Sequence, residues 1–269
     1  MIEKGKYLRF YEKLLSELPG ISILLLAITS GIPRTNSVEG QDTHPGNKVA
    51  VQLRHMKFIN FVKYRDSNKI DNARPAHFAY ADRLRAQGKL AIGGPLLDDH
   101  GRRIGLLFVY EAVSRDAAVV LAQEDPFALA NALSSYEVTE WRLRGVSLDL
   151  LVKANRSADQ IGGGDPQIRL FANYAKYGAD KSRLATVRSA HWEYDRSLKS
   201  AGRLALAGPF ANDEGGLFVY NAVRKEEARS YLKQDPFATE GVFADYELLE
   251  WLIEGANPDL LASDFSSKE

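Results

Sequence analysis

The chain has no cysteine among its 269 residues. This absence excludes disulfide scaffolds, thiolate zinc sites, iron–sulfur clusters and cysteine nucleophiles. Long hydrophobic runs are also missing: the most apolar stretch, 21–28, has about eight residues, and a membrane-spanning helix needs about twenty. The acidic residues Glu3, Glu12 and Glu17 precede this stretch, whereas the first part of a secretory signal is short and basic. We therefore expect no membrane partner and a cytoplasmic location.

Neither sign of charge dominates, because 35 lysines and arginines balance 35 aspartates and glutamates. A protein that binds nucleic acid non-specifically needs a basic face, so the sequence predicts no nucleic-acid partner. The five histidines form no HxH or HExxH motif, and we expect neither a metal site nor a cofactor. They are His44, His55, His77, His100 and His191.

An internal repeat organises the chain. The segment RPAHFAYADRLRAQGKLAIGGP at 74–95 recurs as RSAHWEYDRSLKSAGRLALAGP at 188–209. Three further segments recur in the same order: LFVYEAV (107–113) as LFVYNAV (217–223), QEDPFA (123–128) as KQDPFA (233–238), and YEVTEW (136–141) as YELLEW (246–251). Such self-similarity indicates two copies of one structural unit.

The repeat sets the expected domain boundaries. The glycine triplet at 162–164 lacks GxGxxG spacing and a following Lys-Ser/Thr, so we interpret it as part of a flexible linker rather than as a phosphate loop. We expect an extension of unknown role at 1–55, a first domain at 56–152, a linker at 153–166, a second domain at 167–262 and a tail at 263–269.

Each copy has the pattern strand, helix, strand, strand, helix, strand. Aromatic and β-branched residues mark a first strand, the spacing of His77, Tyr80 and Leu84 gives one helical face, and Ser114 is a good N-cap. In the first copy we expect strands at 58–64, 90–92, 105–111 and 133–141 and helices at 74–87 and 115–122, with Gly93-Gly94-Pro95 ending the second strand.

This βαββαβ order predicts an α+β protein made of two tandem ferredoxin-like domains. A single unit would leave one apolar face of its sheet uncovered, and sheets bury such faces. We therefore expect the two sheets to pack together as an intramolecular pseudo-dimeric α/β barrel. The chain would be a monomeric pseudo-dimer, with further association left open.

Four motifs occur in both copies: R-x-x-H early in the first helix, G-x-L-x-x-x-G-P, a short acidic turn, and D-P-F after the second helix. On these motifs the chain resembles the YCII (YciI-like) family of the dimeric α/β-barrel superfamily. The resemblance implies that His77 acts with Asp125, and His191 with Asp235, as catalytic pairs. One branch of the family is similar to dehydrochlorinases that act on chlorinated hydroxyquinols.

A His–Asp pair suits acid/base chemistry near neutral pH, because the carboxylate fixes the tautomer of the imidazole and stabilises its protonated form. Abstraction of a phenolic or α-carbonyl proton could then be followed by loss of chloride or water, or by double-bond migration. Structural alternatives remain open: His77 could pack beneath the sheet, and Asp125, which precedes a proline, could be a helix cap.

Further residues shared by the copies are candidates for substrate binding. The arginine of R-x-x-H could hold a phenolate or carboxylate, or form a solvated ion pair. The tyrosines could line an aromatic pocket or belong to the core, and Gly-Pro could admit a ligand or shape the strand end. These residues are Arg74, Arg188, Tyr80, Tyr194, Gly94, Pro95, Gly208 and Pro209.

The hypothesis from the sequence is a cofactor-independent enzyme of lyase, dehydrochlorinase or isomerase type. Its small-molecule substrate would be a hydroxylated aromatic or related cyclic metabolite. The first copy is expected to be the more active, because its turn and helix are closer to the family pattern. The alternative is a non-catalytic metabolite-binding or accessory protein of the same family.

Overall fold

The structure, a computed structural model, describes residues 55–156 and 165–262. The expected extension at 1–55 lies outside these residues except for its last position. The tail at 263–269, the glycine triplet of the linker and His44 also lie outside them.

The first repeat has the predicted order of elements. It comprises β1 (Met56–Tyr64), α2 (Ser67–Ala86), β2 (Leu90–Leu97), β3 (Arg103–Ala112), α3 (Arg115–Gln123), α4 (Pro126–Leu129) and β4 (Leu133–Trp141), followed by the short β5 (Gly145–Val146) and α5 (Leu148–Ala154). The strand order β4-β1-β3-β2 is antiparallel throughout, with helices against one face, which is the ferredoxin-like arrangement.

The second repeat has the same order. It comprises β6 (Leu170–Tyr177), α6 (Lys181–Ser200), β7 (Leu204–Pro209), β8 (Gly215–Asn221), α7 (Lys225–Gln234), α8 (Pro236–Thr239), β9 (Phe243–Trp251), β10 (Gly255–Ala256) and α9 (Pro258–Ala262). Its strands lie in the equivalent order β9-β6-β8-β7.

The start of the first helix and the end of the second strand differ most from the predicted boundaries. Helix α2 begins at Ser67, about two turns before Arg74, where Asp66 caps it by accepting a hydrogen bond from the amide of Lys69. Its first turns bury only Ile70, so apolar periodicity is weak there. Strand β2 does not stop at Gly93-Gly94-Pro95 but runs through it to Leu97, since the glycines make room for neighbouring groups instead of ending the strand.

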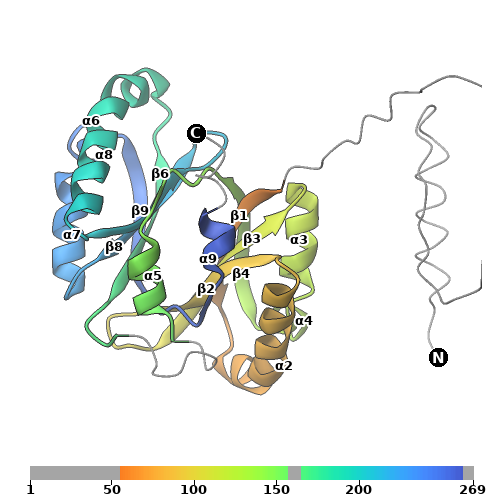
Figure 1. Ribbon diagram of the computed structural model, residues 1–269. Helices are drawn as coiled ribbons and strands as arrows, with labels where there is room; N and C mark the ends of the chain where they lie inside the picture. Colours follow the sequence, from red (N-terminus) through yellow and green to blue (C-terminus); the bar gives the residue numbers. More distant parts are fainter. Residues whose placement is uncertain (1–54, 157–164, 263–269) are drawn as a thin grey trace, which may run out of the picture. The chain divides into compact units, whose positions relative to one another are not determined.

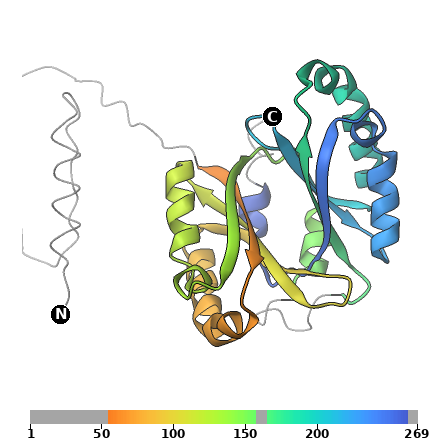
Figure 2. The same cartoon turned by 180° about the vertical axis from the view of Figure 1, so that it is seen from behind.

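The two sheets face each other, as predicted, with α2, α3, α4, α6, α7 and α8 on their outer faces and with α5 and α9 packed on the core between them (Figure 1; Figure 2). The apolar core between them takes Ile59, Phe61 and Leu107 from the first repeat and Tyr174 and Leu217 from the second. The rings of Phe61 and Tyr174 stack with centroids 4.5 Å apart. The sheet faces that the sequence left without a partner therefore cover each other.

Two equivalent seams join the sheets into one barrel. At one seam β2 pairs with β9 through Leu96 and Trp251, and at the other Trp141 pairs with Phe210. In each seam a buried tryptophan donates from Nε1 to a glycine carbonyl of the opposite repeat: Trp141 to Gly208 at 2.8 Å and Trp251 to Gly94 at 3.1 Å. The molecule is thus a pseudo-dimeric α/β barrel within one chain.

Both glycines of these seams are required by close backbone approach. A Cβ on Gly94 would lie 1.9 Å from the carbonyl oxygen of Leu252, and one on Gly208 would lie 2.2 Å from that of Arg142. Leu252 and Arg142 in turn donate their amides to the carbonyls of Pro95 and Pro209. The shared Gly-Pro therefore shapes the seam between the repeats.

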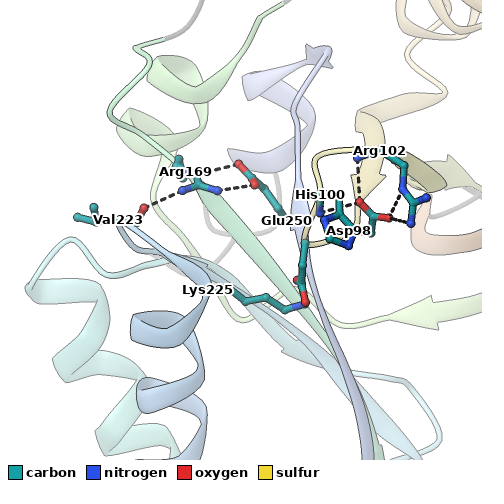
Figure 3. A network of polar contacts seen from close by, with 8 residues as sticks. Asp98, His100, Arg102, Arg169, Val223, Lys225 and Glu250 are labelled. Carbon is teal, nitrogen blue, oxygen red and sulfur yellow. Dashed lines mark hydrogen bonds and ion pairs between the residues drawn. The ribbon is translucent and has the colours of Figure 1, made fainter.

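The longer hairpin turn of the first repeat reaches the second repeat (Figure 3). Asp98 closes the turn by accepting from the amides of His100 and Arg102 and from the Arg102 guanidinium, contacts that lower the pKa of Asp98 to about 2. The next residue, Asp99, pairs with Lys225 at the start of α7. His100 is exposed, as is His55.

No helix within the described ranges is long and apolar enough to cross a membrane.

Candidate functional site

His77 lies on the face of α2 that packs on the sheet, and its side chain is buried. Its Nδ1 lies 2.9 Å and 3.0 Å from the two carboxylate oxygens of Asp125. The ring stacks on Phe127, with centroids 3.9 Å apart and planes 11° from parallel. The carboxylate and this aromatic neighbour together fix the orientation of the imidazole.

Asp125 performs both of the roles that the sequence left open. It is the N-cap of α4, where its Oδ1 accepts a hydrogen bond from the amide of Phe127 at 2.9 Å, and the same carboxylate contacts His77. The side chain is almost fully buried. A capped, buried carboxylate is held rigidly, so the helix cap positions the partner of the histidine.

A cavity of about 260 Å³ opens beside His77. Because Nδ1 is engaged with Asp125, the ring nitrogen left for the cavity is Nε2, and it has no hydrogen-bond partner among the described residues. The wall consists of Tyr64, Arg74, His77, Phe78, Ala81, Asp82, Arg85, Gly93, Gly94, Pro95, Arg103, Leu106, Phe108, Phe127, Arg156 and Glu254.

Tyr64, at the end of β1, is a cavity residue that the sequence analysis missed. Its ring meets Phe127 edge-on at 5.6 Å. Burial, and then the nearby charge of Asp125, raise the pKa of Tyr64 well above its ordinary value. The phenol therefore stays protonated and can donate a hydrogen bond to an oxygen of a bound ligand.

Residues beyond the repeated motifs complete the cavity. Arg156 follows α5, and Glu254 precedes β10 of the second repeat and pairs with Arg103 at 2.5 Å. The guanidinium of Arg85 lies against Gly255, where a Cβ would be 2.2 Å from its Nη1. No motif spacing could have indicated these contacts, because the barrel brings them together.

The second repeat contains the same His–Asp arrangement. Nδ1 of His191 lies 2.8 Å and 3.0 Å from the carboxylate oxygens of Asp235, which caps α8 by accepting from the amide of Phe237. The His191 ring stacks on Phe237 at 3.8 Å. Both predicted pairs are therefore formed in the structure.

The surroundings of His191 differ from those of His77. Asp195, one helical turn after His191, occupies the position of Ala81 in the first repeat. One of its carboxylate oxygens lies 3.4 Å from Nε2 of His191, and burial raises the pKa of Asp195 to about 7. The imidazole nitrogen that faces the cavity in the first repeat thus faces a carboxylate of the protein itself in the second.

A second difference in sequence also fills the space beside His191 in the second repeat. Where the first repeat has Leu106, the second has Gly216, and the hydroxyl of Tyr177 lies 2.7 Å from where a Cβ on Gly216 would be. Tyr177 is the counterpart of Tyr64, and burial raises its pKa far above the ordinary value. The tyrosine of the second repeat has moved into space that a leucine occupies in the first.

His191, Asp195 and Asp235 are a group that could offer three ligand atoms to a metal ion, since these atoms lie within 4.8 Å of one another. However, Nδ1 of His191 already contacts Asp235, which leaves only Nε2 and Asp195 free to share an ion. Structural zinc sites usually have four protein ligands, so this donor set is a poor fit for zinc.

The predicted substrate-binding residues do not all lie at one site. Arg74, Gly94 and Pro95 are on the cavity wall of the first repeat, although Arg74 also pairs with Asp71. Arg188 pairs with Asp213 at 3.1 Å. Gly208 and Pro209 belong to the seam described above.

Tyr80 and Tyr194 lie in the helical core and not on the described cavity wall. Tyr80 donates its hydroxyl to the carbonyl of Leu121 at 2.6 Å, and Tyr194 donates to that of Tyr231 at 2.8 Å. Burial raises the pKa of Tyr194 to about 12. These two tyrosines take the core alternative that the sequence left open.

Among the solved structures that this chain resembles is one with clear sequence similarity over about one repeat. The 5-chloro-2-hydroxyhydroquinone dehydrochlorinase of Burkholderia phenoliruptrix AC1100, in complex with 2,5-dihydroxybenzoquinone, is 32% identical over 32% of this chain and 94% of that one, with a TM-score of 0.29. No curated protein matches the chain.

Other solved structures are similar to the chain in shape at low sequence identity. A heme-binding protein of Thermus thermophilus is 12% identical over 78% of this chain and 94% of that one, with a TM-score of 0.45. Chlorite dismutase of Candidatus Nitrospira defluvii is 10% identical over 77% of this chain and 94% of that one, with a TM-score of 0.46. At these values neither carries an inference about activity.

The model of the YCII-related domain matches residues 56–142 and again residues 170–252. These two segments are the two βαββαβ units of the barrel, and together they span more than half of the chain. The chain therefore belongs to the YCII-related domain family and carries this domain twice in tandem.

Proposed function

We propose that the protein is a cofactor-independent enzyme that uses His77 and Asp125 for acid/base chemistry on a hydroxylated aromatic or related cyclic compound. The reaction would be of lyase, dehydrochlorinase or isomerase type. The observation that carries the proposal is that Nδ1 of His77 is held by Asp125 while Nε2 is left for the cavity. The dehydrochlorinase that is 32% identical over one domain length supports the substrate class.

In the proposed reaction each group has a role. Neutral His77 carries its proton on Nδ1, donated to Asp125, so the lone pair of Nε2 accepts a proton from a phenolic O–H or an acidic C–H. The electron pair of the broken bond forms a C=O or C=C bond, and a leaving group such as chloride departs with its own bonding pair. In an isomerisation, His77 returns the proton to another atom of the ring.

The remaining wall stabilises the charge that develops on the substrate. Tyr64, whose phenol remains protonated, donates to an oxygen that becomes negative, and the nearby guanidinium groups lower the energy of an enolate or phenolate. A cavity of about 260 Å³ is near the lower end of ligand sites, which span about 300–1,000 Å³, and this size favours a single-ring compound.

The first repeat is assigned the activity because Asp195 and Tyr177 occupy the equivalent space in the second. The His191–Asp235 pair is then retained for the packing of α6 against α8 and for capping. An accessory protein of this family would contact its partners through the apolar face of its sheet, and in this barrel the apolar faces of the two sheets cover each other.

The test compares His77→Gln with His191→Gln, a matched pair of substitutions in the two repeats. Chloride release and ring absorbance are measured with chlorinated hydroxyhydroquinones, and proton exchange is measured with unchlorinated hydroquinones and cyclic enones. We expect His77→Gln to lower turnover by about 10²–10⁴-fold and His191→Gln to leave it near wild type. Unchanged turnover in His77→Gln would contradict the proposal, and saturable binding without turnover would favour a metabolite-binding protein.

A further inference from the structure

The cavity wall of the first repeat carries more positive than negative charge. Four arginines line it (Arg74, Arg85, Arg103 and Arg156), whereas only two acids do so, Asp82 and Glu254. Because the cavity is small and half-enclosed, an excess of guanidinium groups there favours an anion over a neutral ligand.

Three of the arginines have carboxylate partners. Arg74 pairs with Asp71, Arg85 pairs with Asp82, and Arg103 pairs with Glu254. The partners on α2 lie toward solvent, since the side chains of Asp71 and Asp82 are 63% and 62% exposed. Solvent screens such pairs strongly, so they compensate little of the positive charge inside the cavity.

Arg156 has no ion-pair partner in the part of the chain that the structure describes. Its position is fixed nonetheless, because its backbone amide donates to the carbonyl of Ile253 at 2.9 Å. The segment after α5 is thus tied to the second repeat and presents a guanidinium group to the cavity of the first. This cation is available to a ligand without breaking an existing pair.

In the second repeat, protein carboxylates occupy positions equivalent to the cavity of the first repeat. Its Asp195 replaces Ala81 and lies 3.4 Å from Nε2 of His191. Its Asp213, two residues before the shared Gly215, replaces Arg103 and lies 3.1 Å from Arg188, the counterpart of Arg74. In the second repeat, carboxylates of the protein therefore lie against His191 and Arg188. These two residues are the counterparts of His77 and Arg74, which line the cavity of the first repeat.

We infer that the substrate of the first repeat carries a carboxylate, or an equivalent fixed anion, in addition to the acidic proton that His77 removes. Arg156 and Arg74 bind the anion, and the ring bearing the acidic proton lies toward Nε2 of His77. The inference rests on the proposed function for the role of His77. The selection of an anion depends only on the cavity wall, so the two can be tested separately.

The test uses 2,5-dihydroxybenzoate and its methyl ester, which share the ring and hydroxyl groups and differ in charge. Dissociation constants are measured by calorimetry at neutral pH, where the carboxylate is ionised. We expect the full-length chain to bind the acid about tenfold or more tightly than the ester. The difference should shrink as salt is added, because added ions screen the attraction.

Arg156→Gln is the decisive variant, because Arg156 is exposed and has no described ion pair whose loss would disturb the fold. We expect it to weaken binding of the acid about tenfold and to leave binding of the ester unchanged. Arg102→Gln is the matched control, since Arg102 is a hairpin arginine that pairs with Asp98 and is not on the cavity wall. It should change neither dissociation constant.

Equal affinity for the acid and the ester would overturn the inference, as would an acid affinity unaffected by Arg156→Gln. Failure of both probes to bind at millimolar concentration would also count against it. His77→Gln separates the inference from the proposed function: the preference for the acid should persist in this variant. If the preference persists but His77→Gln does not impair turnover, the proposed chemistry fails and the anion site stands.

Discussion

The carboxylate of Asp195 lies 3.4 Å from Nε2 of His191, whereas the equivalent position in the first repeat is Ala81. The side chain of Asp195 is only 14% exposed, and its Oδ1 is buried without a hydrogen-bond partner among the described residues. A carboxylate in this setting blocks the ring nitrogen that would act as a base. The two repeats therefore share a His–Asp pair and differ in the group that faces Nε2 of the histidine.

The first prediction concerns stability as a function of pH. Burial raises the pKa of Asp195 from 3.8 to about 7. Between these values the folded chain keeps a proton that the unfolded chain has lost, so stability falls as pH rises through this window and stays lower above it. Asp195→Asn removes this loss, and we expect it to stabilise the protein by about 2–4 kcal/mol at about pH 8 but not at about pH 4.

Urea unfolding at the two pH values measures this effect. Glu193→Gln is the control, because Glu193 is exposed on the same helix. Its effect on the free energy of unfolding should be the same at both pH values. Destabilisation by Asp195→Asn at high pH would show instead that the ionised carboxylate stabilises the fold through His191.

The second prediction separates the two roles of Asp125. Asparagine can still cap α4, so Asp125→Asn should cost less than about 1 kcal/mol of stability, whereas Asp125→Ala also loses the cap. Both variants lose the carboxylate on Nδ1 of His77, and we expect turnover to fall by about 10²–10⁴-fold in each. The measurements are kcat/KM and the free energy of unfolding.

Ser114→Ala is the control for the cap alone. Ser114 caps α3 by accepting from the amide of Ala117 at 3.1 Å and is not on the cavity wall. It should cost about 1 kcal/mol of stability and leave turnover unchanged. Full turnover in Asp125→Asn would mean that Asp125 serves the fold only.

The third prediction concerns the seam between the repeats. A Cβ on Gly208 would lie 2.2 Å from the carbonyl oxygen of Arg142. Both groups belong to the backbone of paired segments, so neither can move away easily. Gly208→Ala should therefore destabilise the barrel by about 2 kcal/mol or more, measured by urea unfolding. Gly145→Ala, in the adjacent β5, is the control because its Cβ would meet only the Cβ of Ala207 at 3.8 Å. Equal effects of the two variants would argue against a tight seam.

The fourth prediction compares two tyrosines of the first repeat. Tyr80→Phe leaves the carbonyl of Leu121 without its 2.6 Å hydrogen bond and should cost about 1–3 kcal/mol of stability, with turnover preserved. Tyr64→Phe should change stability little but lower kcat/KM by about tenfold, because Tyr64 lines the cavity. The reverse result, loss of turnover with Tyr80→Phe alone, would place the site on the other side of α2.

Much of the site could be predicted from local sequence. The histidine of R-x-x-H and the aspartate of D-P-F recur in both copies, and the structure joins them in both. Asp195 was also within reach of prediction, because residues four apart on a helix share a face and Asp195 follows His191 at that spacing. Comparing it with Ala81 would have indicated that the copies differ at the histidine.

Other parts of the site could not be predicted. Arg156 and Glu254 lie outside the repeated motifs, and they reach the cavity only because the seams bring the end of each repeat against the other. Tyr64 lies on β1, and its periodicity marks it only as a strand residue. Its place on the wall depends on where α4 packs, which local pattern does not determine.

The sequence by itself determined the duplication, the βαββαβ order and the His–Asp pairs, because these follow from repetition, periodicity and short motifs. Only the tertiary structure decided that the Gly-Pro segments and tryptophans form the seams, and that Glu254 of the second repeat joins the cavity wall of the first. The physical reason is distance along the chain: periodicity reports which face of an element is buried, whereas the group that covers this face comes from the other repeat.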